Sequence, residues 1–178
     1  TLATNASGSR SYKYGATRDY VESIAVTLAD GRKTILKRGL KISEPLRLED
    51  GSSITFPDIS YQSPKCKNAA GFYVHPGMDW LDLFVGSEGT LGIFTEIVLR
   101  LAPRPEAFVS GILFFPNEVS CWEMILKIRS LKGLKIDPCS LEYFDHNALD
   151  RLKKVYKNVP KNSQAALFFE QDVTTQNN

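Results

Sequence analysis

Two glycine-rich segments carry the residue types that could bind an anionic ligand. The first, Thr4-Asn5-Ala6-Ser7-Gly8, combines small hydroxyl and amide side chains with a glycine. The second, Gly86-Ser87-Glu88-Gly89-Thr90-Leu91-Gly92, has a glycine at every third position. Glycine lets the backbone approach a ligand closely, and free backbone N–H groups can bind a pyrophosphate. Two such segments in one domain indicate a nucleotide held from two sides.

The spacing of these glycines excludes two common phosphate-binding motifs. The second segment is not a P-loop, because no Gly-Lys-Ser or Gly-Lys-Thr follows it, and its glycine spacing differs from the Rossmann fingerprint. On spacing alone, a tight turn between two structural elements explains these glycines equally well. Asn5-Ala6-Ser7 also matches the N-glycosylation pattern, which is common by chance, so we do not interpret it as a modification site.

The composition is that of an ordinary globular protein. The chain has 178 residues, of which 43% are hydrophobic and 24% charged, and its formal net charge is +2. A chain of this length can bury a substantial core, and its low net charge gives no reason to expect nucleic-acid binding. The apolar runs fall short of the ~20 residues of a membrane-spanning helix. We therefore expect a cytoplasmic protein, with peripheral membrane attachment as the alternative.

The cysteines and histidines do not form a recognisable metal or disulfide pattern. Cys66, Cys121 and Cys139 contain no Cys-x-x-Cys pair, and His75 lies far from His146. We therefore expect reduced thiols and no metal site built from this chain alone.

The hydrophobic pattern predicts two α+β parts, joined at the stiff connector Pro103-Arg104-Pro105-Glu106. Alternation of apolar residues predicts strands, helical spacing predicts helices, and Asp30-Gly31 predicts a tight turn. The expected elements of the first part are a loop over 1–16, a hairpin over 19–37, a stretch with little periodicity over 39–76, a short helix over 79–84 and a strand over 93–101. Those of the second part are a strand over 108–115, a helix over 118–131 capped by Asn117, a strand over 140–144, a helix over 147–156 and a strand over 165–170. This order suits a layer with its helices on one face of a sheet.

Taken with their neighbours, the two glycine segments resemble a known family. The stretches ATNASGSRSYKYGATRD (3–19), KNAAGF (67–72) and LFVGSEGTLGI (83–93) carry the resemblance. They resemble the vanillyl-alcohol oxidase, or PCMH-type, FAD-binding superfamily. Within it they are most similar to the branch of D-lactate dehydrogenase, the glycolate oxidase flavin subunit and D-2-hydroxyglutarate dehydrogenase. The similarity is strong over 1–105 and weak over 106–170.

The resemblance implies a fold and a set of cofactor contacts. Residues 1–104 would be the second half of a PCMH-type FAD-binding domain, and residues 105–178 the beginning of a ferredoxin-like, substrate-side cap domain. Two groups of residues would contact FAD. The group near the pyrophosphate and towards the isoalloxazine is Thr4, Asn5, Ala6, Ser7 and Gly8, and the group around the ADP portion is Glu88, Gly89, Thr90, Leu91, Gly92 and Ile93.

The resemblance also implies an activity. The parent protein would oxidise a small D-2-hydroxy acid such as D-lactate or glycolate, with hydride transfer to the flavin and reoxidation by a quinone, cytochrome or electron-transfer protein. No catalytic residue is assigned, because His75 and His146 lie outside the family motifs and Glu142 lies in a cap-domain strand, where we expect a solvated or structural role. Since the chain begins inside a motif at Thr1, we expect a piece of a longer protein that holds FAD weakly alone. Homo-oligomerisation stays open.

Two other functions fit the same motifs. Alkyl-dihydroxyacetonephosphate synthases share the Gly-Ser-Glu-Gly-Thr-Leu-Gly motif but catalyse a flavin-dependent transfer. Asn5 slightly favours the dehydrogenase branch. A flavin-free remnant retained as an interaction domain is the third hypothesis.

Overall fold

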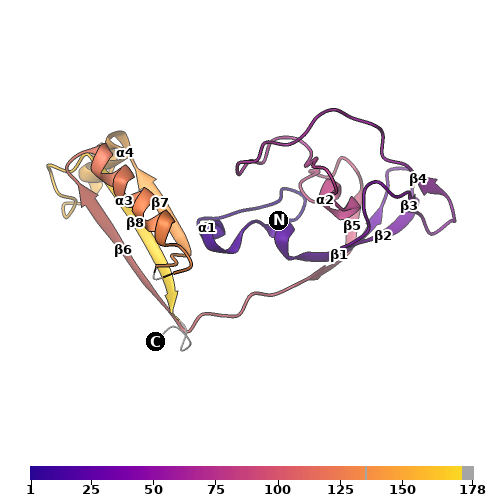
Figure 1. The fold of residues 1–178 in the computed structure, drawn as a ribbon, viewed down its shortest axis with the longest axis horizontal. Helices are drawn as coiled ribbons and strands as arrows, with labels where there is room; N and C mark the ends of the chain where they lie inside the picture. The colour runs from indigo at the N-terminus through magenta and orange to yellow at the C-terminus, as the bar shows by residue number, and fades with distance from the viewer. Residues whose placement is uncertain (135, 174–178) are drawn as a thin grey trace. The chain divides into compact units, whose positions relative to one another are not determined.

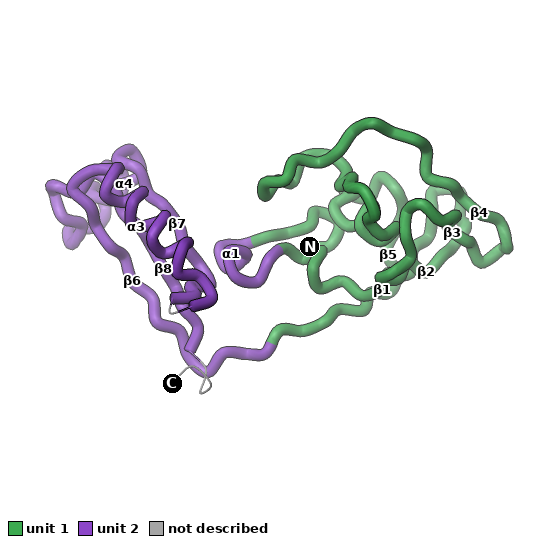
Figure 2. The backbone as a smooth tube through the Cα atoms, in the orientation of Figure 1, with its two compact units in different colours: residues 1–7, 16–102 green, residues 8–15, 103–178 purple. Residues whose placement is uncertain are grey.

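The computed structural model describes residues 1–134 and 136–173, which form two compact units (Figures 1 and 2). Unit 1 consists of Thr1–Ser7 and Ala16–Ala102, and unit 2 consists of Gly8–Gly15 and the described residues from Pro103 onward. Both units mix helices with strands, as the α+β prediction requires.

Unit 1 is built on a three-stranded antiparallel sheet in the order β2-β1-β5. β1 (Val21–Thr27) and β2 (Lys33–Lys37) form the predicted hairpin, and β5 (Ile93–Leu99) pairs with the other edge of β1. Ile24 and Val26 are fully buried, so alternate residues of β1 face the core, as the sequence pattern indicated. The sheet therefore fixes the position at which the second glycine segment enters β5.

The short helix α2 (Trp80–Phe84) packs on this core and ends just before the second glycine segment. Trp80, Leu81 and Phe84 are buried together with Leu2 near the amino terminus. The Asp82 carboxylate accepts a hydrogen bond of 3.1 Å from the Asp79 backbone N–H, which stabilises the first turn of the helix. Burial of Leu2 against this core holds the first glycine segment close to the second.

Four short elements of the first part were not predicted. α1 (Ser11–Tyr14) and a 3-10 turn (Thr17–Tyr20) occupy a region read mostly as loop. β3 (Leu46–Arg47) pairs with β4 (Ser53–Ile54) inside the stretch with little periodicity. Elements this short do not contain enough residues to show a period in the sequence.

Unit 2 contains an antiparallel sheet in the order β6-β8-β7, visible in Figure 1. Every element predicted after residue 105 is present: β6 (Ala107–Phe115), α3 (Glu118–Leu131), β7 (Ser140–Phe144), α4 (His146–Val155) and β8 (Ala165–Val173). The predicted cap of α3 is also present, because the Asn117 side-chain oxygen accepts a hydrogen bond of 2.9 Å from the Ser120 N–H.

The two helices of unit 2 pack on opposite faces of its sheet, which corrects the expectation of a single helical face. α3 packs with Ala165 and Leu167 in one hydrophobic cluster. Leu149 of α4 lines a hollow together with Ala166. Ala166 lies between Ala165 and Leu167 in β8. Because adjacent residues of a strand point to opposite faces, α4 lies on the other side. The order of elements could not reveal this, since a helix joining two adjacent antiparallel strands can fold to either side.

Residues 8–15 belong to unit 2 through charged contacts with β8. The Lys13 Nζ lies 2.8 Å from the Asp172 carboxylate, and the Tyr14 hydroxyl donates to the same carboxylate at 2.8 Å. Arg10 Nε donates to Glu170 at 2.6 Å. These contacts explain why a segment at the start of the chain is part of the second unit.

The three cysteines are free thiols. Within residues 1–134 and 136–173, no helix combines the length and hydrophobicity that crossing a membrane requires.

Candidate functional site

The two glycine-rich segments lie side by side in unit 1. The Gly86 N–H donates to the Leu2 carbonyl at 3.0 Å, and the Glu88 N–H donates to the Ala3 carbonyl at 2.7 Å. The peptide groups immediately before Thr4 are therefore joined to those at the start of the second segment. The sequence prediction that these two stretches converge is confirmed.

One non-glycine residue in each segment has a left-handed backbone. Asn5 has a φ of 44° and Glu88 a φ of 52°. The side-chain oxygen of Asn5 accepts a hydrogen bond of 3.0 Å from the Arg18 N–H, which helps to hold that conformation. Asparagine adopts this backbone readily, but glutamate does so with strain, and strained residues cluster at ligand-binding and catalytic sites, so Glu88 marks the second segment as a candidate.

Two of the predicted glycines are needed for close packing. A Cβ atom on Gly86, whose φ is 90°, would lie 3.3 Å from the Asn5 Cβ. A Cβ on Gly92 would lie 2.7 Å from the Thr27 carbonyl oxygen. Gly86 therefore permits contact between the two segments, whereas Gly92 permits the pairing of β5 with β1. The role of Gly92 is therefore structural, whereas the sequence motif predicted that Gly92 contacts the ligand.

Three hollows follow one another along the two segments. The polar hollow is lined by Thr4, Asn5, Arg18, Asn68, Ala69, Ala70, Gly71, Tyr73 and Gly86. The middle hollow shares Gly71 and Gly86 with it and adds Phe72, Ser87, Glu88 and Thr90. The apolar pocket shares Phe72 and Thr90 with the middle hollow. The lining therefore changes from polar to apolar along a single row.

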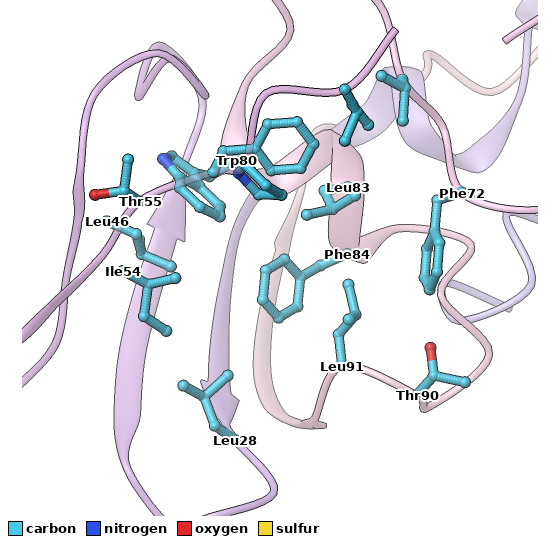
Figure 3. A pocket seen from close by; sticks show the side chains of 14 residues that line it. Leu28, Leu46, Ile54, Thr55, Phe72, Trp80, Leu83, Phe84, Thr90 and Leu91 are labelled. Carbon is cyan, nitrogen blue, oxygen red and sulfur yellow. The ribbon is translucent and has the colours of Figure 1, made fainter. Parts of the chain in front are cut away.

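The apolar pocket is the largest of the three, with a volume of about 450 Å³. Figure 3 shows Phe72 and Thr90 on one side of it and Leu46 and Ile54 on the opposite side. Thr55 and Thr90 are the polar residues among its fourteen lining residues apart from the Trp80 indole, whose Nε1 donates to the Glu44 carbonyl. A volume and lining of this kind suit the flat ring of an organic ligand.

Arg18 connects the polar hollow to the end of α2. Its guanidinium donates to the carbonyls of Asp82 and Val85 and lies 4.0 Å from the centre of the Tyr73 ring. The residue is only 7% exposed. Burial lowers the pKa of the guanidinium, while the Asp82 carboxylate acts in the opposite direction. Arg18 thus carries a positive charge into the lining of the hollow.

A loop covers the polar hollow and is held at its base. The Ser63 N–H donates to the Val74 carbonyl at 2.8 Å, and the Val74 N–H donates to the Ser63 hydroxyl at 2.9 Å. Both residues are buried, whereas residues 64–72 between them are exposed. We call residues 64–73 the cover loop. It brings Asn68 to Gly71 and Tyr73 to the hollow.

The structure places the predicted site residues in different environments. Thr4 and Asn5 line the polar hollow, Glu88 and Thr90 the middle one, and Thr90 and Leu91 the apolar pocket.

The remaining predicted residues are not in the lining of these hollows. Ala6 accepts hydrogen bonds from Thr17 through its carbonyl. Ile93 is 71% exposed at the start of β5, and Gly8 belongs to unit 2. Ser7 and Gly89 do not line the three hollows either.

Sequence reasoning missed Arg18, Tyr73 and the cover loop as parts of the site. A signal was present, because Arg18 and residues 67–72 both lie in stretches that carry the family resemblance. Their convergence on one hollow depends on tertiary contacts, which the motifs alone do not specify.

Comparison with known proteins identifies the relatives of the chain. No protein-family model matches it. It is 32% identical over 169 residues to the glycolate oxidase subunit GlcD of Bacillus subtilis, covering 94% of this chain and 29% of that protein. It is 35% identical over 120 residues to a D-lactate dehydrogenase of Anaerostipes hadrus, covering 67% and 19% respectively. A D-2-hydroxyglutarate dehydrogenase of Stutzerimonas stutzeri is 26% identical over 151 residues, covering 85% and 25%.

Solved structures of alkyldihydroxyacetonephosphate synthase share the fold. Two of them superpose with TM-scores of 0.58 and 0.59 at 18% and 20% identity, covering 98% and 96% of this chain and 28% and 27% of theirs. The chain spans less than a third of the length of each of these relatives. The predicted resemblance is confirmed: over this part of their length, the chain is a homologue of the glycolate oxidase subunit, D-lactate dehydrogenase and D-2-hydroxyglutarate dehydrogenase proteins.

Proposed function

We propose that the chain belongs to an FAD-dependent oxidoreductase that oxidises a small D-2-hydroxy acid such as D-lactate or glycolate. In this proposal unit 1 is the second half of the FAD-binding domain, and unit 2 is the beginning of a ferredoxin-like cap domain on the substrate side. The domain boundary at residues 104 and 105 stays a prediction. The observation that carries the proposal is the pairing of the two glycine segments along a row of hollows that runs from polar to apolar.

Ser87 and the adjacent glycines suit a hydrogen-bond acceptor of a ligand in the middle hollow, which the exposed Glu88 side chain also lines. Ser87 is 2% exposed, lines the hollow, and its hydroxyl finds no hydrogen-bond partner among the described residues. A buried hydroxyl without a partner is costly, so it is expected where a ligand completes the hydrogen bond. The absence of side chains at Gly86 and Gly89 leaves the adjacent backbone accessible.

The direction of the row matches the chemistry of a dinucleotide. Thr4, Asn5 and Ser87 offer hydroxyl and amide groups for anionic oxygens at one end, and the apolar pocket offers a surface for a flat ring at the other. When bound, a flavin supplies the acceptor for the electrons of the substrate. The residues of this chain hold and orient it, and they exclude water around its apolar part.

The names of the relatives support the substrate class. Glycolate, D-lactate and D-2-hydroxyglutarate are all small 2-hydroxy acids, and those names come from relatives that align with 67–94% of this chain. The synthase structures share the fold at 18–20% identity, which carries no argument about the reaction. The dehydrogenase class is therefore the better supported one.

A flavin-binding titration with a matched pair of serines tests the cofactor site. Ser87 and Ser140 are both buried, and both have a hydroxyl without a hydrogen-bond partner among the described residues, but only Ser87 lines the middle hollow. We expect Ser87→Ala to weaken FAD binding about fivefold, as for one lost hydrogen bond. Ser140→Ala should leave it unchanged. Equal affinity of both variants and the parent protein would contradict this placement of the cofactor.

The reaction class needs the protein in which this chain occurs. Its oxidation of D-lactate, glycolate and D-2-hydroxyglutarate should be followed with an artificial dye as electron acceptor. Reduction of the dye with at least one of these acids, and none with the L-enantiomers of lactate and 2-hydroxyglutarate, is the expected result. A protein that binds FAD but reduces no dye with any of the three acids would exclude the proposed substrate class.

A further inference from the structure

The buried charges around Arg18 do not balance. Five charged side chains form one network: Arg18 and Arg38 contact Asp82 at 3.6 and 2.6 Å, and Arg38 and Lys41 contact Asp79 at 3.6 and 2.8 Å. Among the described residues, three cations in this network thus share two carboxylates. One positive charge is left over, and the network is buried or half-buried over most of its members.

The geometry assigns the excess charge to Arg18. The side chain of Arg18 is 9% exposed, against 28% for Arg38 and 49% for Lys41, so solvent compensates it least. Its distance of 3.6 Å to Asp82 is also longer than the 2.6 Å from Arg38 to the same carboxylate. Burial of a charge without a matching partner is unfavourable, so an anion beside Arg18 would be strongly favoured.

Arg18 has a donor available for such an anion. Its two terminal nitrogens donate to backbone carbonyls, but its Nε is buried and has no hydrogen-bond partner among the described residues. The hollow that Arg18 lines is otherwise bounded by a hydroxyl, two side-chain amides, small residues and Tyr73, with no carboxylate among them. This lining suits an acceptor-only group such as a phosphate.

Residues of the cover loop line this hollow and leave little space in it. The hollow has a volume of about 20 Å³, which is enough for a water molecule but not for a phosphate group. Tyr73 of the cover loop stacks on the Arg18 guanidinium at 4.0 Å and so hides the charge. Admission of an anion therefore requires the loop between Ser63 and Val74 to shift.

We propose that Arg18 is the anion-binding residue of a phosphate subsite, which opens when the cover loop moves away from the guanidinium. The inference deepens the proposed function and rests on it for the identity of the nucleotide. A planar guanidinium held by two backbone carbonyls presents its Nε–H in a fixed direction, which suits recognition of a phosphate oxygen. Arg18 thus positions the phosphate next to Thr4 and Asn5.

Calorimetric titration of the purified chain with inorganic pyrophosphate and with ADP tests the subsite. The matched pair is Arg18→Lys and Arg38→Lys, since both arginines contact Asp82 but only Arg18 lines the hollow. We expect Arg18→Lys to weaken binding of both probes about tenfold, because lysine keeps the charge but loses the guanidinium geometry. Arg38→Lys should change it by less than about twofold.

A second pair of variants tests the cover loop without touching the arginine. Tyr73→Leu removes the ring that stacks on Arg18, and Tyr73→Phe keeps it. If the loop hides the charge, Tyr73→Leu should tighten pyrophosphate binding about fivefold, the equivalent of one cation–π contact. Tyr73→Phe should resemble the parent chain. The opposite directions expected for Arg18→Lys and Tyr73→Leu cannot both arise from a general loss of folding.

The outcomes separate the subsite from the proposed function. No detectable pyrophosphate binding, or equal binding by the parent and Arg18→Lys, overturns the subsite. If FAD still binds in that case, the cofactor proposal stands and only the role of Arg18 is wrong. If FAD also fails to bind to the protein in which the chain occurs, the cofactor proposal falls independently.

Discussion

The backbone N–H of Glu88 donates a hydrogen bond of 2.7 Å to the carbonyl oxygen of Ala3, joining two glycine-rich segments that are far apart in the sequence. Glu88 has a left-handed backbone, with a φ of 52°. Asn5, two residues after Ala3, is left-handed as well. The backbone conformation of each segment therefore depends on the other, and a substitution in one segment should alter the conformation of both.

Gly86 is the first place to test this dependence. Gly86→Ala adds a Cβ atom 3.3 Å from the Asn5 Cβ, in addition to the cost of a side chain at a φ of 90°. Gly31 has a φ of 85° with open space around it, so Gly31→Ala measures the backbone cost alone. We expect Gly86→Ala to lower the free energy of unfolding in urea by about 1 kcal/mol more than Gly31→Ala. An equal decrease in the free energy of unfolding for both variants would mean that a side chain at position 86 does not collide with Asn5.

Most elements were predictable because each has a local signal. Alternating apolar residues indicated β1, the Asp30-Gly31 turn indicated its hairpin with β2, and Asn117 indicated the start of α3. The convergence of the glycine segments followed from the family motifs rather than from periodicity. Each of these features depends on residues close together in the sequence or on a distinctive sequence motif.

The features that were missed depend on contacts between distant residues. Gly92 serves the pairing of β5 with β1, because its missing Cβ leaves room for Thr27. Arg18 becomes part of the site because α2 ends where its guanidinium can reach the carbonyls of Asp82 and Val85. No local pattern distinguishes such a glycine or arginine from one in an ordinary loop.

Asp172 should make unit 2 sensitive to acid. Burial alone would raise the pKa of its carboxyl group, but hydrogen bonds from Lys13 and Tyr14 outweigh burial and lower the pKa. A lowered pKa in the folded state means that this stabilisation is complete above the pKa of the unfolded chain and is lost as the pH falls through the folded value. The loss should therefore occur below about pH 4, measured as the free energy of unfolding against pH.

Two variants separate the charge of Asp172 from its other contacts. Asp172→Asn should cost about 1–2 kcal/mol at pH 7, because Lys13 loses one of its two carboxylate partners but keeps Asp137 at 2.8 Å, and it should flatten the acid dependence. Tyr14→Phe removes only the hydrogen bond from the hydroxyl and should cost about 1 kcal/mol. An acid profile that is the same in the parent and Asp172→Asn would assign the sensitivity to other carboxylates.

Cys66 should be the reactive thiol of the folded chain. It is exposed in the cover loop, whereas Cys121 and Cys139 are buried, and burial raises the pKa of both buried thiols. Reaction depends on an accessible thiolate, so a disulfide reagent such as Ellman's reagent should modify one thiol of the native protein and all three in denaturant. The Cys66→Ser variant should show no fast-reacting thiol. Rapid modification of a second thiol in the native state would disagree with the packing around α3 and β7.

Glu88 offers a test in which stability and ligand binding should change in opposite directions. Its φ of 52° is unfavourable for glutamate, and its exposed side chain lines the middle hollow. Asparagine tolerates a left-handed backbone better, so Glu88→Asn should raise the free energy of unfolding by about 0.5–1 kcal/mol. If the carboxylate accepts a hydrogen bond from a ribose hydroxyl of the bound nucleotide, the same variant should weaken FAD and ADP binding several-fold without affecting pyrophosphate. Glu88→Gln provides the control, because it removes the charge without relieving the backbone. A gain in stability with unchanged ADP affinity would show that the left-handed glutamate contributes to the turn alone.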